Sequence, residues 1–226
     1  MNSTIRRSFI RSVFLSAGAL TLAGVSPWAW AADEAPDAMI QRLSSEVLDL
    51  IRSDKTLQSG DIARVMDVVD SKIMPNVNFS RMTASATGPG WRKATAEQRQ
   101  KLQQEFKTLL VRTYAGALRQ VGEQTIEMRP LRASEADKEV LVRTLVRGRG
   151  EPVQLDYRLE KTPGQGAGWK IYDLNVAGIW LVDTYRPQFA QQINANGVDG
   201  LIASLVERNR ANAAASASAN ASAGGR

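Results

Sequence analysis

The stretch GWKIYDLNVAGIWLVDTYRPQF, residues 168–189, decides the fold of this chain. Its first part has the alternation of a β-strand, and the spacing after Gly178 is that of a helix. The predicted helix opens with four large apolar side chains in succession, at residues 179–182. A helix that buries only one stripe does not need such a run. We therefore expect apolar material on more than one side of this helix.

Three further strands are predicted upstream of this stretch. Residues 126–128, 140–147 and 153–160 each alternate apolar and polar side chains. Turn-prone clusters at residues 134–138, 148–152 and 163–168 separate these runs. Because loops this short join antiparallel neighbours, the sequence predicts a curved, four-stranded antiparallel sheet.

Helical spacing surrounds the strands. Apolar residues repeat at helical intervals in residues 36–51, 62–73 and 198–206, and most strongly in residues 94–121, where Thr95 and Gln98 form a capping-box pattern. Helices that lie across one face of a sheet give the α+β class. Such a layer packs around either a filled core or a cavity, and the alternation fits both.

The two ends of the chain differ from the middle in composition. Residues 1–31 combine three arginines, an apolar stretch and the small residues Ala29 and Ala31, which predicts a signal peptide cleaved after Ala31. A retained membrane anchor fits less well, because the apolar run is short and interrupted; the paired arginines Arg6 and Arg7 leave both Sec and twin-arginine export open. Residues 32–210 are predicted to form one domain, and the Ala/Ser/Asn-rich residues 211–226 to be disordered.

Composition excludes several classes of function. The chain has neither cysteine nor histidine, so disulfides, thiolate chemistry, Ser-His triads and most zinc sites are excluded. Removing the three arginines of the signal peptide lowers the formal net charge from +6 to +3, which leaves little support for a nucleic-acid partner. An exported, cysteine-free chain of this size fits a bacterial periplasm.

Two separated blocks resemble a known family. WKIYDLNVAGIWLVDTYRPQF (residues 169–189) is similar to the signature of the MlaC family of periplasmic phospholipid carriers, also called toluene-tolerance proteins. GPGWRKATAEQRQKLQQEFKTLLVRTYAGAL (residues 88–118) is similar to that family's second block. Two blocks are far more specific than one short motif.

The resemblance implies a nuclear-transport-factor-2-like sheet that encloses an apolar pocket for acyl chains. It also implies a shuttle that moves phospholipid between an outer-membrane MlaA lipoprotein with its porin and the inner-membrane Mla ABC transporter, which maintains outer-membrane lipid asymmetry. We expect a monomer that has no catalytic residue, no metal, no cofactor and no nucleic-acid partner.

Candidates for the pocket lining come from the inward face of the strands, the long helix and the start of the last helical region. They are Leu110, Tyr114, Leu118, Val140, Val142, Val146, Val153, Leu155, Tyr157, Leu159, Ile171, Leu174, Ile179, Leu181 and Val182. Ile171 and Leu174 fall on opposite faces of a regular strand, so their orientation stays open.

Two other functions remain open. The same cone-shaped fold occurs in isomerases of the ketosteroid type, which use a carboxylate base and a tyrosine. Asp156 and Tyr157 are adjacent in a predicted strand and point to opposite faces, and Tyr172 and Asp173 have the same arrangement. A periplasmic scaffold module with a filled core is the third alternative.

Overall fold

The computed structural model describes residues 34–134 and 136–223, with side chains as far as residue 216. The predicted signal peptide lies outside the described residues. Among the helices that are described, none has both the length and the apolar character that a membrane span requires.

One antiparallel sheet confirms the predicted α+β class. Its strands follow one another in the order β1-β2-β3-β4-β5. They are β1 (Thr125–Met128), β2 (Glu139–Arg147), β3 (Val153–Lys161), β4 (Trp169–Val176) and β5 (Ile179–Trp180). The prediction of four strands was short by the two-residue β5.

The extra strand corrects the prediction that a helix opens at Ile179. Ala177 and Gly178 have φ angles of 53° and 88°, and Val176 pairs with Ile179 across them. Two consecutive residues with positive φ form the tight turn that suits a β-hairpin. The chain therefore returns alongside β4 for two residues before the helix begins at Leu181.

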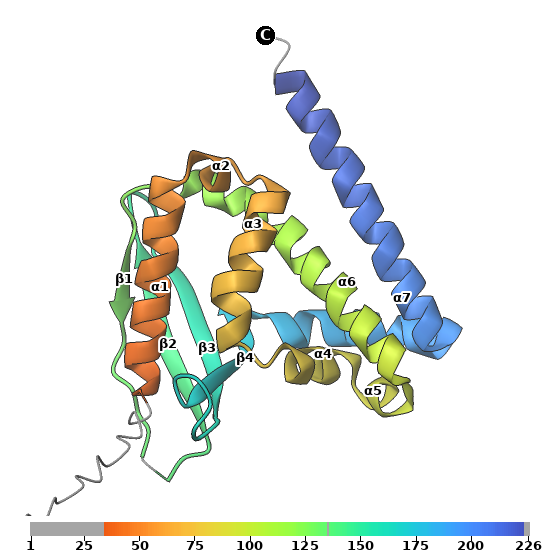
Figure 1. The fold of residues 1–226 in the computed structure, drawn as a ribbon, viewed down its shortest axis with the longest axis horizontal. Coiled ribbons are helices and arrows are strands. Elements are labelled where there is room, and N and C mark those ends of the chain that lie inside the picture. The colour runs from red at the N-terminus through yellow and green to blue at the C-terminus, as the bar shows by residue number, and fades with distance from the viewer. Residues whose placement is uncertain (1–33, 135, 224–226) are drawn as a thin grey trace, which may run out of the picture. The chain divides into compact units, whose positions relative to one another are not determined.

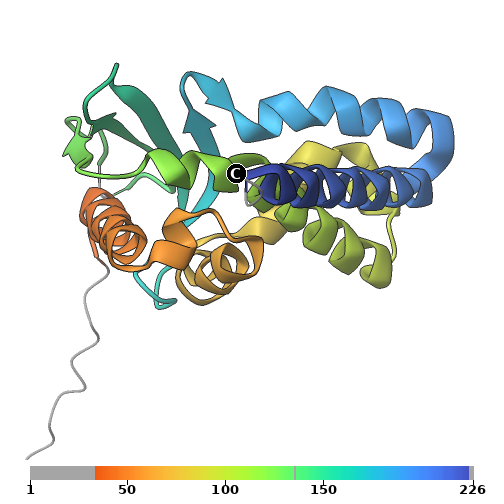
Figure 2. The same cartoon turned by 90° about the horizontal axis from the view of Figure 1, so that it is seen from above.

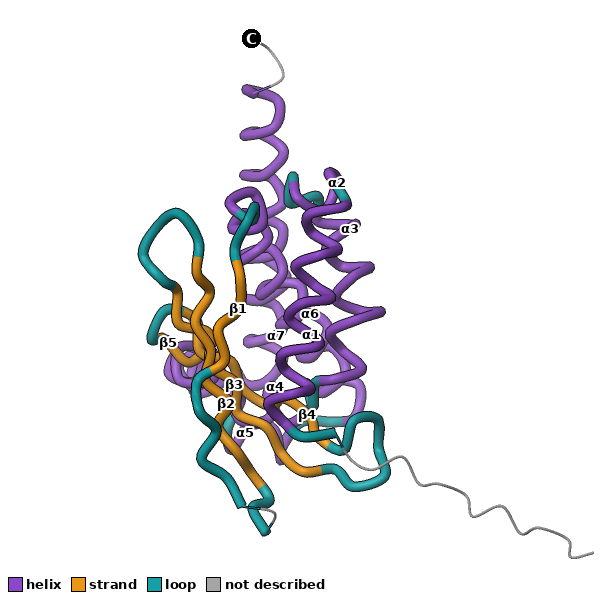
Figure 3. Tube along the Cα trace, turned by 90° about the vertical axis from the view of Figure 1, so that its left-hand side faces the viewer, coloured by secondary structure: helices purple, strands orange, loops and turns teal. Residues whose placement is uncertain are grey.

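The first helices cover one face of the sheet. They are α1 (Pro36–Ser53), α2 (Lys55–Gln58), α3 (Ile62–Val68), the π-helical η1 (Val69–Ile73) and the 3-10 turn η2 (Met74–Asn76). Figures 1 and 3 show α1 and α3 side by side on the same side of the strands. Met39 and Ile40 of α1 are fully buried in one cluster with Val142 and Leu159 of the sheet.

A second core joins the remaining helices. These are α4 (Phe79–Thr87), α5 (Pro89–Lys93), α6 (Ala96–Tyr114) and α7 (Leu181–Ala223), whereas the 3-10 segment η3 (Ala115–Gln120) packs through Ala115 in a separate cluster with residues of α1, α2 and α3. The ring of Phe106 in α6 lies 5.0 Å from that of Tyr185 and 5.2 Å from that of Phe189, both edge-on, as aromatic pairs prefer. The predicted capping box at the start of α6 is confirmed by hydrogen bonds in both directions between Thr95 and Gln98.

The last helix changes direction once. Gly197 has φ 68° and ψ −171°, so α7 breaks there and its second half turns back along α6 (Figure 2). Asn209, near the end of that contact, donates to the Glu105 carbonyl oxygen at 3.0 Å. Beyond it the helix continues to Ala223, whereas composition predicts disorder from Ala211. Alanine has the highest helix propensity, which favours this continuation.

Candidate functional site

An apolar cavity of about 510 Å³ lies between the inner face of the sheet and the helices. Its walls come from α1, α3, η1, η2, α4, α6, η3, all strands except β5, and the first residue of α7. Of the described side chains that line it, only four carry a polar group: Ser44, Lys107, Tyr114 and Tyr157. A volume of this size with so few polar groups is typical of a site for an apolar ligand.

Nine of the fifteen predicted residues line the cavity, namely Leu110, Tyr114, Leu118, Val146, Leu155, Tyr157, Ile171, Leu174 and Leu181. The sheet and α6 bring them together as the strand alternation predicts. That any of them contacts a ligand stays a prediction.

The other six predicted residues lie elsewhere. Val140, Val142 and Leu159 are buried in the core beneath α1, and Val182 is buried in the helical core with Phe106. Val153 and Ile179 are 42% and 58% exposed, because both lie at the end of the sheet where the hairpins turn. Alternation indicates the correct face of a strand, but it does not distinguish a filled core from a cavity on that face.

A bulge settles the orientation of β4. Ile171 pairs with Leu159 and Asp173 pairs with Arg158, so Tyr172 is an extra residue between them. An extra residue shifts the alternation by one position. As a result Ile171 and Leu174 both face the cavity, although three residues separate them.

Helices that the sequence indicated only as cover supply much of the wall. Leu43, Val47 and Ile51 of α1 line the cavity, as do Val69 and Ile73 of η1. The available signal was the breadth of their apolar stripes. Such stripes fit core packing equally well, so nothing in the sequence separated the two roles.

The polar groups in the wall are neutral or paired. The Tyr157 hydroxyl lies 3.5 Å from Ser44 Oγ, and burial raises the pKa of Tyr157 to about 12, so the phenol is neutral at pH 7. Burial also raises the pKa of Tyr114. Lys107 Nζ lies 2.5 Å from Asp70 Oδ1 of η1. The wall therefore presents no unpaired charge to a bound apolar chain.

The polar residues of the 169–189 stretch tie the strand end to α7. Asp173, which is 1% exposed, accepts hydrogen bonds from the Leu174 N–H at 2.9 Å and the Val182 N–H at 3.1 Å. Its other oxygen lies 2.9 Å from Arg158 Nη1, although burial still raises the pKa of Asp173. These bonds hold the first turn of α7, and with it Leu181, against the cavity.

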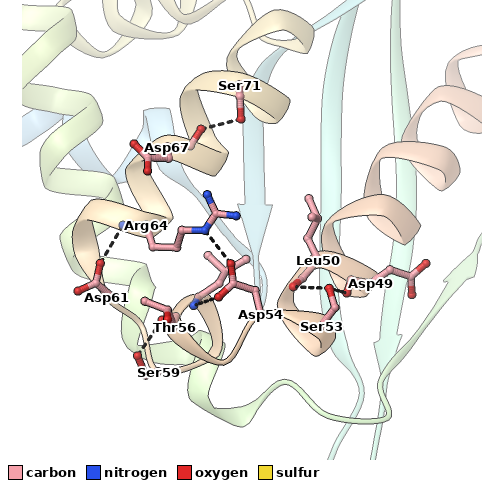
Figure 4. A network of polar contacts seen from close by, with 11 residues as sticks. Asp49, Leu50, Ser53, Asp54, Thr56, Ser59, Asp61, Arg64, Asp67 and Ser71 are labelled. Atoms are coloured by element: carbon pink, nitrogen blue, oxygen red, sulfur yellow. Dashed lines mark hydrogen bonds and ion pairs between the residues drawn. The ribbon is translucent and has the colours of Figure 1, made fainter.

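A cluster of polar side chains around Asp54, Asp61 and Arg64, here called the polar corner, supports the helical wall of the cavity where α1, α2 and α3 meet (Figure 4). Asp54 accepts from the Leu57 N–H at 3.0 Å and from Arg64 Nε at 2.7 Å. The hydrogen bond from Leu57, then that from Arg64, lowers the pKa of Asp54. Asp61 caps α3 by accepting from the Arg64 N–H at 2.8 Å. The corner fixes the angle at which α3 closes over the sheet.

The residues suggested for an isomerase do not converge. Asp156 accepts from the Thr144 N–H at 3.3 Å and from Gln154 Nε2 at 2.5 Å on the outer face of the sheet, whereas Tyr157 faces the cavity. Tyr172 donates to Glu139 at 2.8 Å, also outside the cavity. A base and a tyrosine that act on one substrate must reach the same site.

Comparison with known proteins gives consistent matches. The family model described as MlaC protein matches residues 41–207. A toluene tolerance protein from Pseudomonas putida is 27% identical over 82% of this chain and 85% of its own length. The intermembrane phospholipid transport system binding protein MlaC from Haemophilus influenzae is 23% identical over 77% of this chain and 82% of its own.

A solved structure is similar in both sequence and fold. It is the phospholipid-binding protein from Ralstonia solanacearum in complex with a phospholipid. It is 46% identical, superposes with a TM-score of 0.74, and covers 78% of this chain and 98% of its own.

Proposed function

The chain belongs to the MlaC family, and on that premise we propose that it is a periplasmic carrier that binds a phospholipid with its acyl chains in the apolar cavity. The observation that carries the proposal is the cavity itself, about 510 Å³ with almost wholly apolar walls. The 46% identical protein of Ralstonia solanacearum holds a phospholipid, which supports the same ligand class here.

The energetics favour a closed apolar site of this kind. An acyl chain of about sixteen carbons gains on the order of 10 kcal/mol in a membrane, at about 0.8 kcal/mol per methylene. A carrier must offer comparable burial, since a phospholipid otherwise stays in the bilayer. Such burial is favourable only if the wall places no uncompensated charge against the acyl chain. Lys107, which is paired with Asp70, and the neutral Tyr157 satisfy this condition.

The membrane partners in this proposal are those that the resemblance to the MlaC family implies. The carrier receives or delivers phospholipid at an outer-membrane lipoprotein with a porin and at an inner-membrane ABC transporter, and so maintains outer-membrane asymmetry. It breaks and forms no covalent bond, and the energy for directed transfer comes from its membrane partners.

A transfer assay tests the proposal. Donor vesicles with a quenched fluorescent phospholipid are mixed with acceptor vesicles, with and without the protein from which residues 1–31 have been removed. A carrier raises the transfer rate in proportion to its concentration and holds a lipid when re-isolated. A rate equal to that without protein, together with re-isolated protein that holds no lipid, would refute it and favour a scaffold role.

A further inference from the structure

A second cavity adjoins the apolar one and has a different chemistry. It measures about 750 Å³ and is lined by residues 119–125 and 147–150. Val121 lines both cavities. We call the second one the arginine groove, because Arg119, Arg147 and Arg149 lie in its wall.

The register of β1 and β2 shows how the two cavities meet. Ile126 pairs with Val146, and both line the apolar cavity. The next pair along the strands, Thr125 and Arg147, lines the arginine groove. Because consecutive residues of a strand point to opposite faces of a sheet, Thr125 and Arg147 point away from the apolar cavity, and the residue that the two cavities share is Val121, just ahead of β1. A ligand with an apolar part and a polar part would pass Val121 to reach both cavities.

The groove has a cationic group available for an anion. Arg147 pairs with Glu127, and Arg149 lies 3.8 Å from Glu123, which also lines the groove. Arg119 Nε donates to the Ser59 carbonyl oxygen at 2.8 Å. Among the described residues, no carboxylate forms an ion pair with Arg119. Its terminal nitrogens are thus the donors that remain, and a guanidinium binds phosphate oxygens in a forked geometry.

The loop that forms the groove is fixed by its own contacts. Arg52 of α1 donates from Nε to the Gly122 carbonyl oxygen at 2.8 Å and also contacts the Gln124 carbonyl oxygen. The Gln124 side chain donates to the Gln120 carbonyl oxygen at 2.7 Å. A Cβ at Gly148 would lie 2.9 Å from Gln124 Cγ, so the facing loop packs closely here. The site is therefore organised before an anion enters.

We propose that the arginine groove holds the phosphodiester of the bound lipid, with Arg119 as its principal donor, while the acyl chains occupy the apolar cavity. This inference rests on the proposed function. It assigns a position to the polar part of the ligand, whose charge excludes it from the apolar walls.

The test compares a phospholipid with the same molecule lacking its phosphate. Equilibrium binding of phosphatidylglycerol and of diacylglycerol with identical acyl chains is measured for the wild type, Arg119→Gln and Arg119→Lys. Arg92→Gln, which changes an exposed arginine outside both cavities, is the matched control. Thermal unfolding of every variant checks that the fold is retained, since Arg119 also holds Ser59.

We expect Arg119→Gln to bind phosphatidylglycerol about tenfold more weakly and diacylglycerol about equally, as loss of a charge-assisted contact at an exposed site implies. Arg119→Lys should retain most of the affinity, and the effect of Arg119→Gln should shrink as salt rises. Equal losses for both lipids, or no loss for either, would overturn the assignment.

Two further arms separate the alternatives. Inorganic phosphate that competes with phosphatidylglycerol in the wild type, but not in Arg119→Gln, supports a lipid phosphate in the groove. Phosphate that binds at Arg119 without affecting the lipid assigns the groove to a free anion and overturns the inference. Wild-type protein that binds neither lipid refutes the proposed function itself. Wild type and Arg119→Gln that bind both lipids alike refute only the groove.

Discussion

Filling the apolar cavity from within should abolish lipid binding without unfolding the protein. Leu155 of β3 lines the cavity and is partly exposed to it, so Leu155→Trp places an indole in space that a lipid would occupy. Tryptophan carries about six more heavy atoms than leucine, so its side chain displaces about five methylenes of the bound lipid from the cavity. Each buried methylene contributes about 0.8 kcal/mol to binding. Losing about 4 kcal/mol corresponds to about a thousandfold weaker binding.

Leu141→Trp is the matched control. Leu141 lies in the neighbouring strand β2, is partly buried like Leu155, and does not line the cavity. Phospholipid titration gives the affinities, and denaturant unfolding gives the stability of each variant. Both variants should unfold within about 1.5 kcal/mol of the wild type, since the indole at position 155 enters empty volume. If both folded variants bind phospholipid equally well, the cavity is not the binding site and the reasoning fails.

Three further predictions concern stability. Asp173→Ala should lower the free energy of unfolding by about 2–3 kcal/mol, because the buried Val182 N–H, the partly buried Leu174 N–H and Arg158 lose their acceptor; a loss under about 0.5 kcal/mol in urea titration would contradict this. Gly197→Ala should lower the free energy of unfolding by about 1–2 kcal/mol, because the φ of 68° at Gly197 is strained for alanine. Gly116→Ala is the control: its φ is ordinary and no atom lies within 4 Å of the added Cβ, so the change should be neutral or stabilising. Equal effects of the two substitutions would refute the strain argument. The free energy of unfolding should fall as the pH drops from about 5 to 3, because carboxylates with lowered pKa values stabilise the fold above their ordinary pKa and lose that contribution as they are protonated. Asp173, with a raised pKa, acts in the opposite direction. A fold that gains stability over this range in urea titrations would show that Asp173 dominates. The lowered carboxylates are Asp54, Glu97, Glu127 and Glu139.

The arrangement of strands and helices could be predicted because its signals are local. Period-two alternation marks β2 and β3, and the Thr95 capping pattern marks the start of α6. The hairpin turn at Ala177 and Gly178 was missed because it requires a positive φ at an alanine, which the residue type does not favour. The short β5 was therefore assigned to the helix.

The cavity could be predicted only in part because its lining depends on tertiary packing. Val142 and Leu155 both face inward from adjacent strands, yet Val142 contacts α1 and Leu155 meets open space. The angle of α1 and α3 over the sheet decides between these outcomes, and that angle depends on Asp54 and Arg64, which lie far from the strands in the sequence. The bulge at Tyr172 likewise depends on pairing with β3 and not on the local pattern.

The central claim is that this chain holds a phospholipid in its apolar cavity, and native mass spectrometry of the protein purified from cells tests it most directly. The account predicts a bound mass that lipid extraction identifies as a phospholipid, present in the wild type and Leu141→Trp and absent from Leu155→Trp. A wild-type protein that carries no lipid mass, even after incubation with phospholipid vesicles, would contradict the account.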